Sequence, residues 1–110
     1  MNHGVRHASA VRKLARWSGR FESLGLVLQL QLPVAISDRH EPEPDGSVLR
    51  GPAERYERQL PTAADVVLVI EIADSSLLFD ETTKLRLYAT AGIPVYWIVN
   101  LRDEQVEATP

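Results

Sequence analysis

Hydrophobic positions in the first third of the chain follow first a helical and then a strand-like spacing. Apolar residues recur three or four positions apart over residues 5–24, which predicts one amphipathic helix. Gly25 ends that helix, and over residues 26–32 every second residue is a leucine, as expected for a half-buried strand. Pro33 lacks a backbone donor, so we expect residues 34–36 to continue this strand only at a sheet edge or beyond a bend.

Two polar loops and two further strands occupy the middle of the chain. Gly46–Arg50 is a short strand candidate between loops at residues 37–44 and 51–64, both rich in proline and charged residues. Residues 66–72 read VVLVIEI, a nearly continuous apolar run in which most residues are β-branched. Such a run is typical of a central strand that is covered on both faces.

One more helix and two more strands complete the pattern. Asp80 is a plausible N-cap for a helix over residues 82–91, which Gly92 ends. Residues 95–99 read VYWIV and predict another buried strand, with which a short strand over residues 105–108 can form a hairpin.

This order of elements predicts an α/β fold, a mixed sheet flanked by helices. Because a helix separates them, the strands at residues 66–72 and 95–99 are expected to be parallel interior neighbours. Two helices cover a sheet of about five strands incompletely. We therefore expect exposed apolar surface and association into a homodimer.

Composition narrows the class of protein. The 110 residues, 45% hydrophobic and 25% charged, suit one globular domain spanning residues 1–110. The absence of cysteine excludes disulfide scaffolds, zinc–thiolate sites and cysteine nucleophiles. No apolar run approaches the roughly 20 residues of a membrane span, and no secretory signal pattern is present, so we expect a cytoplasmic protein.

Charge is distributed unevenly within a net charge of −3. Five cations precede the first acidic residue, and the remainder of the chain is acidic; the five are Arg6, Arg12, Lys13, Arg16 and Arg20. A basic helix of this kind can contact phosphate backbones, or it can simply be solvated.

Two carboxylates stand out as candidate chemistry. Glu71 lies inside the apolar run VVLVIEI, where an unpaired charge costs several kcal/mol and needs a cation, a metal or a proton. Alternatively, Glu71 is a glutamate near the end of its strand whose side chain extends to solvent or pairs with an arginine. Asp45 ends a loop that leads into a strand, and alone it would be a turn residue. If neighbouring strands bring the two together, they form a site for Mg²⁺ or Mn²⁺.

The second helix adds a possible partner for these carboxylates. Asp80, Lys84 and Tyr88 are spaced four apart and share one helix face. The simpler interpretation is a surface pair between Asp80 and Lys84. The alternative is that the helix directs Lys84 at Asp45 and Glu71, where an ammonium can stabilise charge on a phosphate. His3 and His7 also have a metal-pair spacing, but chance or contact of His7 with substrate is the favoured interpretation.

Together these segments closely resemble the Uma-two family, restriction-endonuclease-like proteins of the PD-(D/E)XK nuclease superfamily found mainly in bacteria. The resemblance covers about residues 5–108. It is carried by Pro44-Asp45, VIEIADSS at residues 69–76, Phe79-Asp80, Lys84, LYA at residues 87–89, AGIP at residues 91–94 and YWIV at residues 96–99.

The resemblance implies a restriction-endonuclease-like fold and a site in which Asp45, Glu71 and the backbone carbonyl of Ile72 bind Mg²⁺ or Mn²⁺. Lys84 would be the catalytic lysine, taking the place of the superfamily lysine at the position of Ala73. The implied activity is metal-dependent phosphodiester hydrolysis, with DNA as the substrate. Family members generally carry further elements at both ends, so the alternative is a non-catalytic remnant that acts as a binding or self-associating module.

Overall fold

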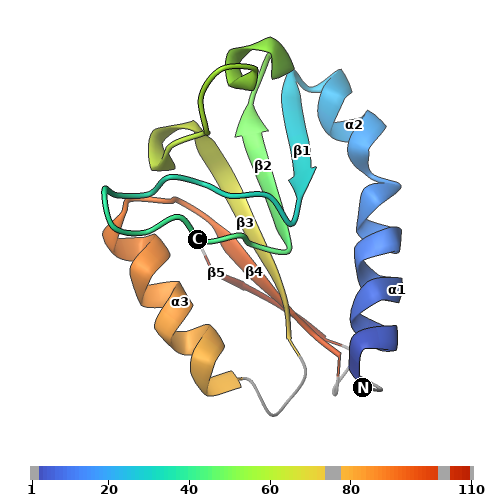
Figure 1. The fold of residues 1–110 in the computed structure, drawn as a ribbon. Coiled ribbons are helices and arrows are strands. Elements are labelled where there is room, and N and C mark those ends of the chain that lie inside the picture. Colours follow the sequence, from blue (N-terminus) through green and yellow to red (C-terminus); the bar gives the residue numbers. More distant parts are fainter. Residues whose placement is uncertain (1–2, 74–77, 102–104, 110) are drawn as a thin grey trace.

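The computed structural model describes residues 3–73, 78–101 and 105–109, which form one mixed sheet with helices on both sides (Figure 1). The strands follow the chain order across the five-stranded sheet. They are β1 (Leu26–Leu30), β2 (Gly46–Arg50), β3 (Val66–Ala73), β4 (Tyr96–Asn100) and β5 (Gln105–Thr109). The helices are α1 (His3–Ala15), α2 (Ser18–Ser23) and α3 (Leu78–Thr90), with 3₁₀ turns η1 (Ala53–Tyr56) and η2 (Ala63–Asp65). The expected α/β class is confirmed.

The centre of the sheet has the predicted arrangement. β3 pairs with β4 in parallel, and the other three neighbouring pairs are antiparallel. Because parallel strands cannot be joined by a tight turn, the chain passes through α3 between them. Seven of the eight β3 residues are buried, as the run VVLVIEI predicts for a strand with both faces covered.

Each face of the sheet has its own hydrophobic cluster. The cluster on the α3 side contains Tyr88 and Ile93 together with Val34, Leu49, Val66 and Val69. The cluster on the opposite side contains Val48, Leu68 and Ile70, against which Leu14 and Phe21 pack from α1 and α2. Figure 1 shows the same division, with α3 on one side of the sheet and α1 and α2 on the other.

The first helical segment differs from the prediction, because it is broken into two helices. The amides of Arg16 and Trp17 donate to the carbonyls of Lys13 and Leu14, three residues back, so the helix tightens at this point and ends. The break lets both Leu14 and Phe21 contact the twisted sheet. Hydrophobic periodicity alone did not reveal it, because apolar residues continue at helical spacing through the break.

Three other local expectations are wrong. β1 ends at Leu30, because Gln31 adopts a left-handed conformation (φ 55°) and Leu32 is exposed. Residues 34–36 form no sheet strand; Val34 packs into the α3-side cluster, and Ala35 makes an isolated parallel bridge to Thr62. Asp80 is not an N-cap, since α3 begins two residues earlier.

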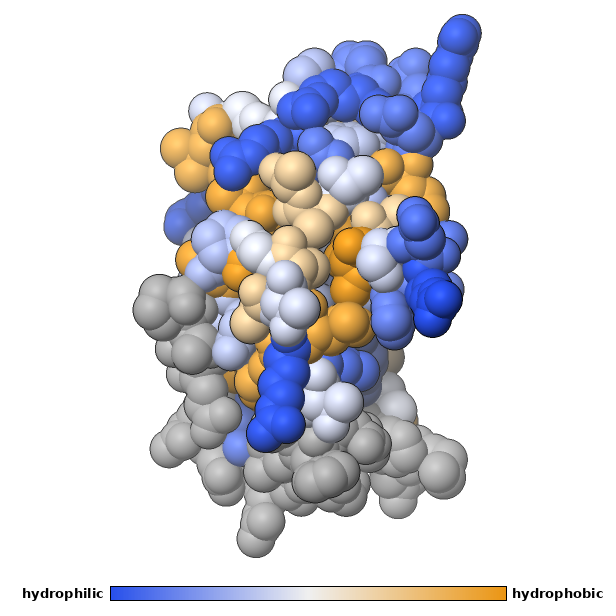
Figure 2. Space-filling model, turned by 90° about the vertical axis from the view of Figure 1, so that its left-hand side faces the viewer, coloured by the Kyte–Doolittle hydropathy of each residue, from blue (hydrophilic) through white to orange (hydrophobic). Residues whose placement is uncertain are grey.

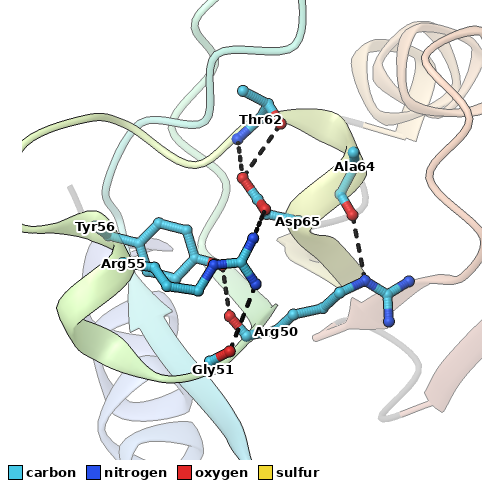
Figure 3. A network of polar contacts seen from close by, with 7 residues as sticks. All are labelled: Arg50, Gly51, Arg55, Tyr56, Thr62, Ala64 and Asp65. Atoms are coloured by element: carbon cyan, nitrogen blue, oxygen red, sulfur yellow. Dashed lines mark hydrogen bonds and ion pairs between the residues drawn. The ribbon is translucent and has the colours of Figure 1, made fainter.

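The loop after β2 is held by a compact polar network (Figure 3). An ion pair of 3.0 Å joins Arg55 to Asp65, whose other carboxylate oxygen accepts from the amide and hydroxyl of Thr62. The Tyr56 hydroxyl donates to the carbonyl of Arg50 at 2.5 Å. These contacts give the segment two 3₁₀ turns where the sequence indicated only a loop.

Ser47 on β2 offers a test of the packing around the sheet. It is completely buried opposite Val69, and within the described part of the chain its hydroxyl has no hydrogen-bond partner. An unsatisfied buried hydroxyl costs about 1–3 kcal/mol. We expect Ser47→Ala to leave the free energy of unfolding unchanged or to raise it by about 1 kcal/mol, as measured by urea denaturation. A loss of stability in Ser47→Ala would contradict this view of the site.

Apolar surface remains exposed on the molecule. Figure 2 shows apolar residues gathered across the middle of the face seen from the left of Figure 1, below a hydrophilic upper rim. Large apolar side chains that are at least a third exposed are Val5, Trp17, Leu24, Leu32, Leu60 and Trp97. The expected homodimer stays a prediction. None of the helices in residues 3–73 and 78–101 has the length and apolarity needed to span a membrane.

Candidate active site

The candidate site lies where β2 begins and β3 approaches its end. Gly46, the first residue of β2, pairs with Ile70 of the antiparallel strand β3. The next position in each direction is Asp45, immediately before β2, and Glu71 within β3. Strand register therefore brings together two carboxylates that are 26 residues apart in the sequence.

Backbone hydrogen bonds tie the two acidic residues to each other's strands. The amide of Asp45 donates to Oε1 of Glu71 at 3.0 Å, and the amide of Ile72 donates to Oδ2 of Asp45 at 2.8 Å. Each carboxylate thus accepts a hydrogen bond from the neighbouring strand. The pair is preorganised by the sheet itself.

From the α3 side, two side chains meet the second oxygen of Glu71. The hydroxyl of Tyr88 donates to Oε2 at 3.0 Å, and Nζ of Lys84 lies 3.3 Å from the same atom. Lys84 and Tyr88 are one helical turn apart, so the face of α3 that packs on the sheet presents both. The interpretation of Lys84 as a partner of Glu71, rather than only of Asp80, is the one that the geometry supports.

From the opposite side of the sheet, α1 contributes His7. Its Nε2 lies 2.8 Å from Oδ1 of Asp45. α1 passes close to Gly46: a Cβ at this position would lie 2.8 Å from a terminal methyl group of Leu14, which would have to move. α1 therefore packs closely over the start of β2, next to Asp45.

Burial dominates the electrostatics of Glu71. Desolvation raises the pKa of its carboxyl, and the charge of Asp45 adds to the rise. The Asp45 amide, the Lys84 ammonium and the Tyr88 hydroxyl oppose it by favouring the ionised form. A carboxyl with a raised pKa that is held by three donors is typical of a functional site.

Glu71 is the most buried side chain of the site, and the three side chains around it are more exposed to solvent. The Glu71 side chain is 2% exposed, that of Asp45 17%, that of His7 29% and that of Lys84 47%. A ligand that approaches the carboxylates from solvent therefore meets Asp45, His7 and Lys84 before it meets Glu71.

The residues fit a hard divalent cation whose coordination is completed by other oxygens. Within the described ranges, no group of three or more His, Asp or Glu side chains gathers as a metal centre. Mg²⁺ commonly binds through one or two carboxylates and keeps several waters, so a full set of protein ligands is not needed. Asp45 and Glu71 provide such a pair of oxygen donors.

Sequence reasoning identified three members of this site and missed two. Asp45, Glu71 and Lys84 come together, although their catalytic and metal-binding roles, and that of the Ile72 carbonyl, stay predictions. Tyr88 was seen only as a neighbour of Lys84 on the helix face, and that spacing was the available signal. His7 was considered only as a metal pair with His3 or as a substrate contact, and its contact with Asp45 was not predicted.

A comparison with models of known protein families identifies the family to which the chain belongs. The model of a family described as "Uma2: Putative restriction endonuclease" matches residues 1–109. The chain belongs to the Uma2 family. No curated protein matches it. Membership confirms the resemblance seen in the sequence, and the mixed sheet with its packed helices is consistent with the restriction-endonuclease-like fold of this Uma2 protein.

Uma2 membership supports a nuclease-like function at the level of the family. A nuclease family in turn indicates nucleic acid as the binding partner.

Proposed function

We propose that the protein is a metal-dependent phosphodiester hydrolase that cleaves DNA as an endonuclease. The observation that carries the proposal is the convergence of Asp45, Glu71 and Lys84, which come from the start of β2, from β3 and from α3. Two adjacent carboxylates with an ammonium beside them suit hydrolysis of a phosphodiester, where negative charge accumulates on the phosphate.

Asp45 and Glu71 would hold Mg²⁺ or Mn²⁺, with the backbone carbonyl of Ile72 as a further ligand. The bound ion would supply Lewis-acid stabilisation of the phosphate and lower the pKa of a water molecule. The Asp45 amide and the Tyr88 hydroxyl orient Glu71 through its two oxygens.

Lys84 is the residue that would act on the substrate directly. Its side chain is about half exposed, so Nζ can contact a phosphate oxygen while it stays close to Glu71. The ammonium would stabilise the charge that develops on the phosphate in the transition state and help activate the attacking water.

The experiment is cleavage of supercoiled plasmid by the purified protein. We expect nicking or linearisation with Mg²⁺ or Mn²⁺ and none with EDTA, and we expect Asp45→Asn to lower the rate by at least about 100-fold. The control is Asp38→Asn, which makes the same change at an exposed loop residue and should cleave like wild type.

Equal cleavage by wild type and Asp45→Asn, purified identically, would assign the activity to a contaminant. No cleavage of DNA with either ion, together with no Mn²⁺ binding in calorimetry, would favour the non-catalytic binding or self-associating module. RNA tested in parallel would reveal a different substrate.

A further inference from the structure

His7 is placed at the site but has no role in the chemistry proposed above. Its Nε2 lies 2.8 Å from Oδ1 of Asp45, and its side chain is 29% exposed. The residue comes from α1, which packs on the face of the sheet opposite α3. Among the described residues, His7 therefore connects α1 to the carboxylate pair.

The two oxygens of Asp45 are held by different elements. Oδ2 accepts from the amide of Ile72 in β3, and Oδ1 contacts His7 in α1. A hydrogen bond on one oxygen leaves the carboxylate more free to turn about its Cβ–Cγ bond than hydrogen bonds on both oxygens, which together restrain the plane of the group. His7 thus supplies the second point of a two-point hold.

We propose that His7 is a positioning residue for the metal site: it fixes the Asp45 carboxylate in the orientation in which Asp45 and Glu71 bind a divalent cation together. This inference rests on the proposed function. Groups that hydrogen-bond to ligating carboxylates typically contribute 10- to 100-fold to metal affinity or activity. The essential property of His7 is then the donor at Nε2, because the partner atom is a carboxylate oxygen.

A purely structural role predicts something different. If His7 only anchors α1 by packing, an apolar side chain of similar size should replace it without consequence for metal binding. If its donor positions Asp45, an apolar replacement should fail, whereas glutamine should succeed because its amide nitrogen can donate from a similar reach. His7→Leu and His7→Gln therefore separate the two roles.

The experiment is Mn²⁺ titration of the full chain by isothermal calorimetry, with thermal unfolding by circular dichroism as the check of folding. We expect His7→Leu to raise the dissociation constant for Mn²⁺ by about 10- to 100-fold. The dissociation constant of His7→Gln should stay within about 3-fold of the wild-type value. The matched control is His40→Leu, at an exposed loop histidine, which should bind Mn²⁺ like wild type. His7→Ala serves as a second variant without a donor if His7→Leu does not fold.

The outcomes distinguish this inference from the proposed function. Absence of Mn²⁺ binding by wild type would overturn the proposed function and the inference with it. Mn²⁺ binding by wild type that is unchanged in the folded variant without a donor would overturn the inference alone. Equal loss of affinity in His7→Leu and His7→Gln would also overturn it, since the ring itself would then be required.

Discussion

Replacing Lys84 by alanine is expected to lower the rate of DNA cleavage by about 100- to 1,000-fold, because a preorganised charge aimed at the reacting phosphate acts mainly in the transition state. Mn²⁺ binding should survive, since both carboxylates remain. The measurements are single-turnover plasmid cleavage at saturating Mn²⁺ and calorimetric titration of the ion. The KM for DNA should change far less than kcat.

The chain has two lysines, which provides a matched control. Lys13→Ala removes the same charge from an exposed position on the basic helix α1. Its single-turnover rate at saturating DNA should equal that of wild type, because a lost phosphate contact there would change DNA binding alone. Because Lys84 also lowers the pKa of Glu71, its loss should make metal binding require a somewhat higher pH. Both assays should therefore be repeated at several pH values, so that the two variants are compared where metal binding is saturated. Cleavage by Lys84→Ala at the wild-type rate would remove Lys84 from the chemistry.

Replacing Glu71 by glutamine is expected to abolish Mn²⁺ binding, and with it cleavage, while the protein becomes more stable at neutral pH. The amide cannot ionise, so one of the two anionic donors is lost. Glutamine keeps an oxygen that can accept the Asp45 amide, but it removes a charge that is 2% exposed. Burial raises the pKa of Glu71 despite the donors that surround it, so the folded protein favours the neutral form, and the neutral amide should raise the free energy of unfolding at neutral pH.

The pH dependence of this gain follows from the raised pKa of Glu71. In the folded protein the carboxyl holds its proton more tightly than in the unfolded chain, so wild-type stability falls as pH rises from the ordinary pKa of 4.5 through the raised one. The advantage of Glu71→Gln should therefore be present above that window and vanish below the ordinary pKa. Urea denaturation at several pH values measures it.

A suitable control is Glu57→Gln, at an exposed residue, which should alter neither metal binding nor the pH profile of stability. Glu71→Gln with wild-type affinity for Mn²⁺ would show that the ion, if bound, lies elsewhere. A loss of stability at neutral pH would show that the contacts of the ionised Glu71 with Lys84 and Tyr88 outweigh the cost of burying it.

The central part of the fold could be predicted from the sequence because its signals are local. Two apolar runs with a helix between them predicted that β3 and β4 are parallel interior strands, and the structure pairs them in this way. Glu71 was recognisable because a carboxylate inside an apolar run must have a partner, and the spacing of Lys84 and Tyr88 placed them on one helix face. These inferences depend on residues that are close together in the chain.

The remaining features depend on contacts between distant segments, which periodicity does not encode. The break between α1 and α2, and the departure of residues 34–36 from the sheet, follow the shape of the surface on which each segment packs. The candidate site also depends on contacts between segments that are distant in the sequence. Strand register brings Asp45 next to Glu71, and the packing of α1 on the sheet brings His7 to Asp45 across 38 residues of sequence. The residue types in the sequence indicated the carboxylates and the lysine. Only tertiary packing decided which donors hold each oxygen, because the donors are backbone amides of Asp45 and Ile72 and side chains from helices on both faces of the sheet.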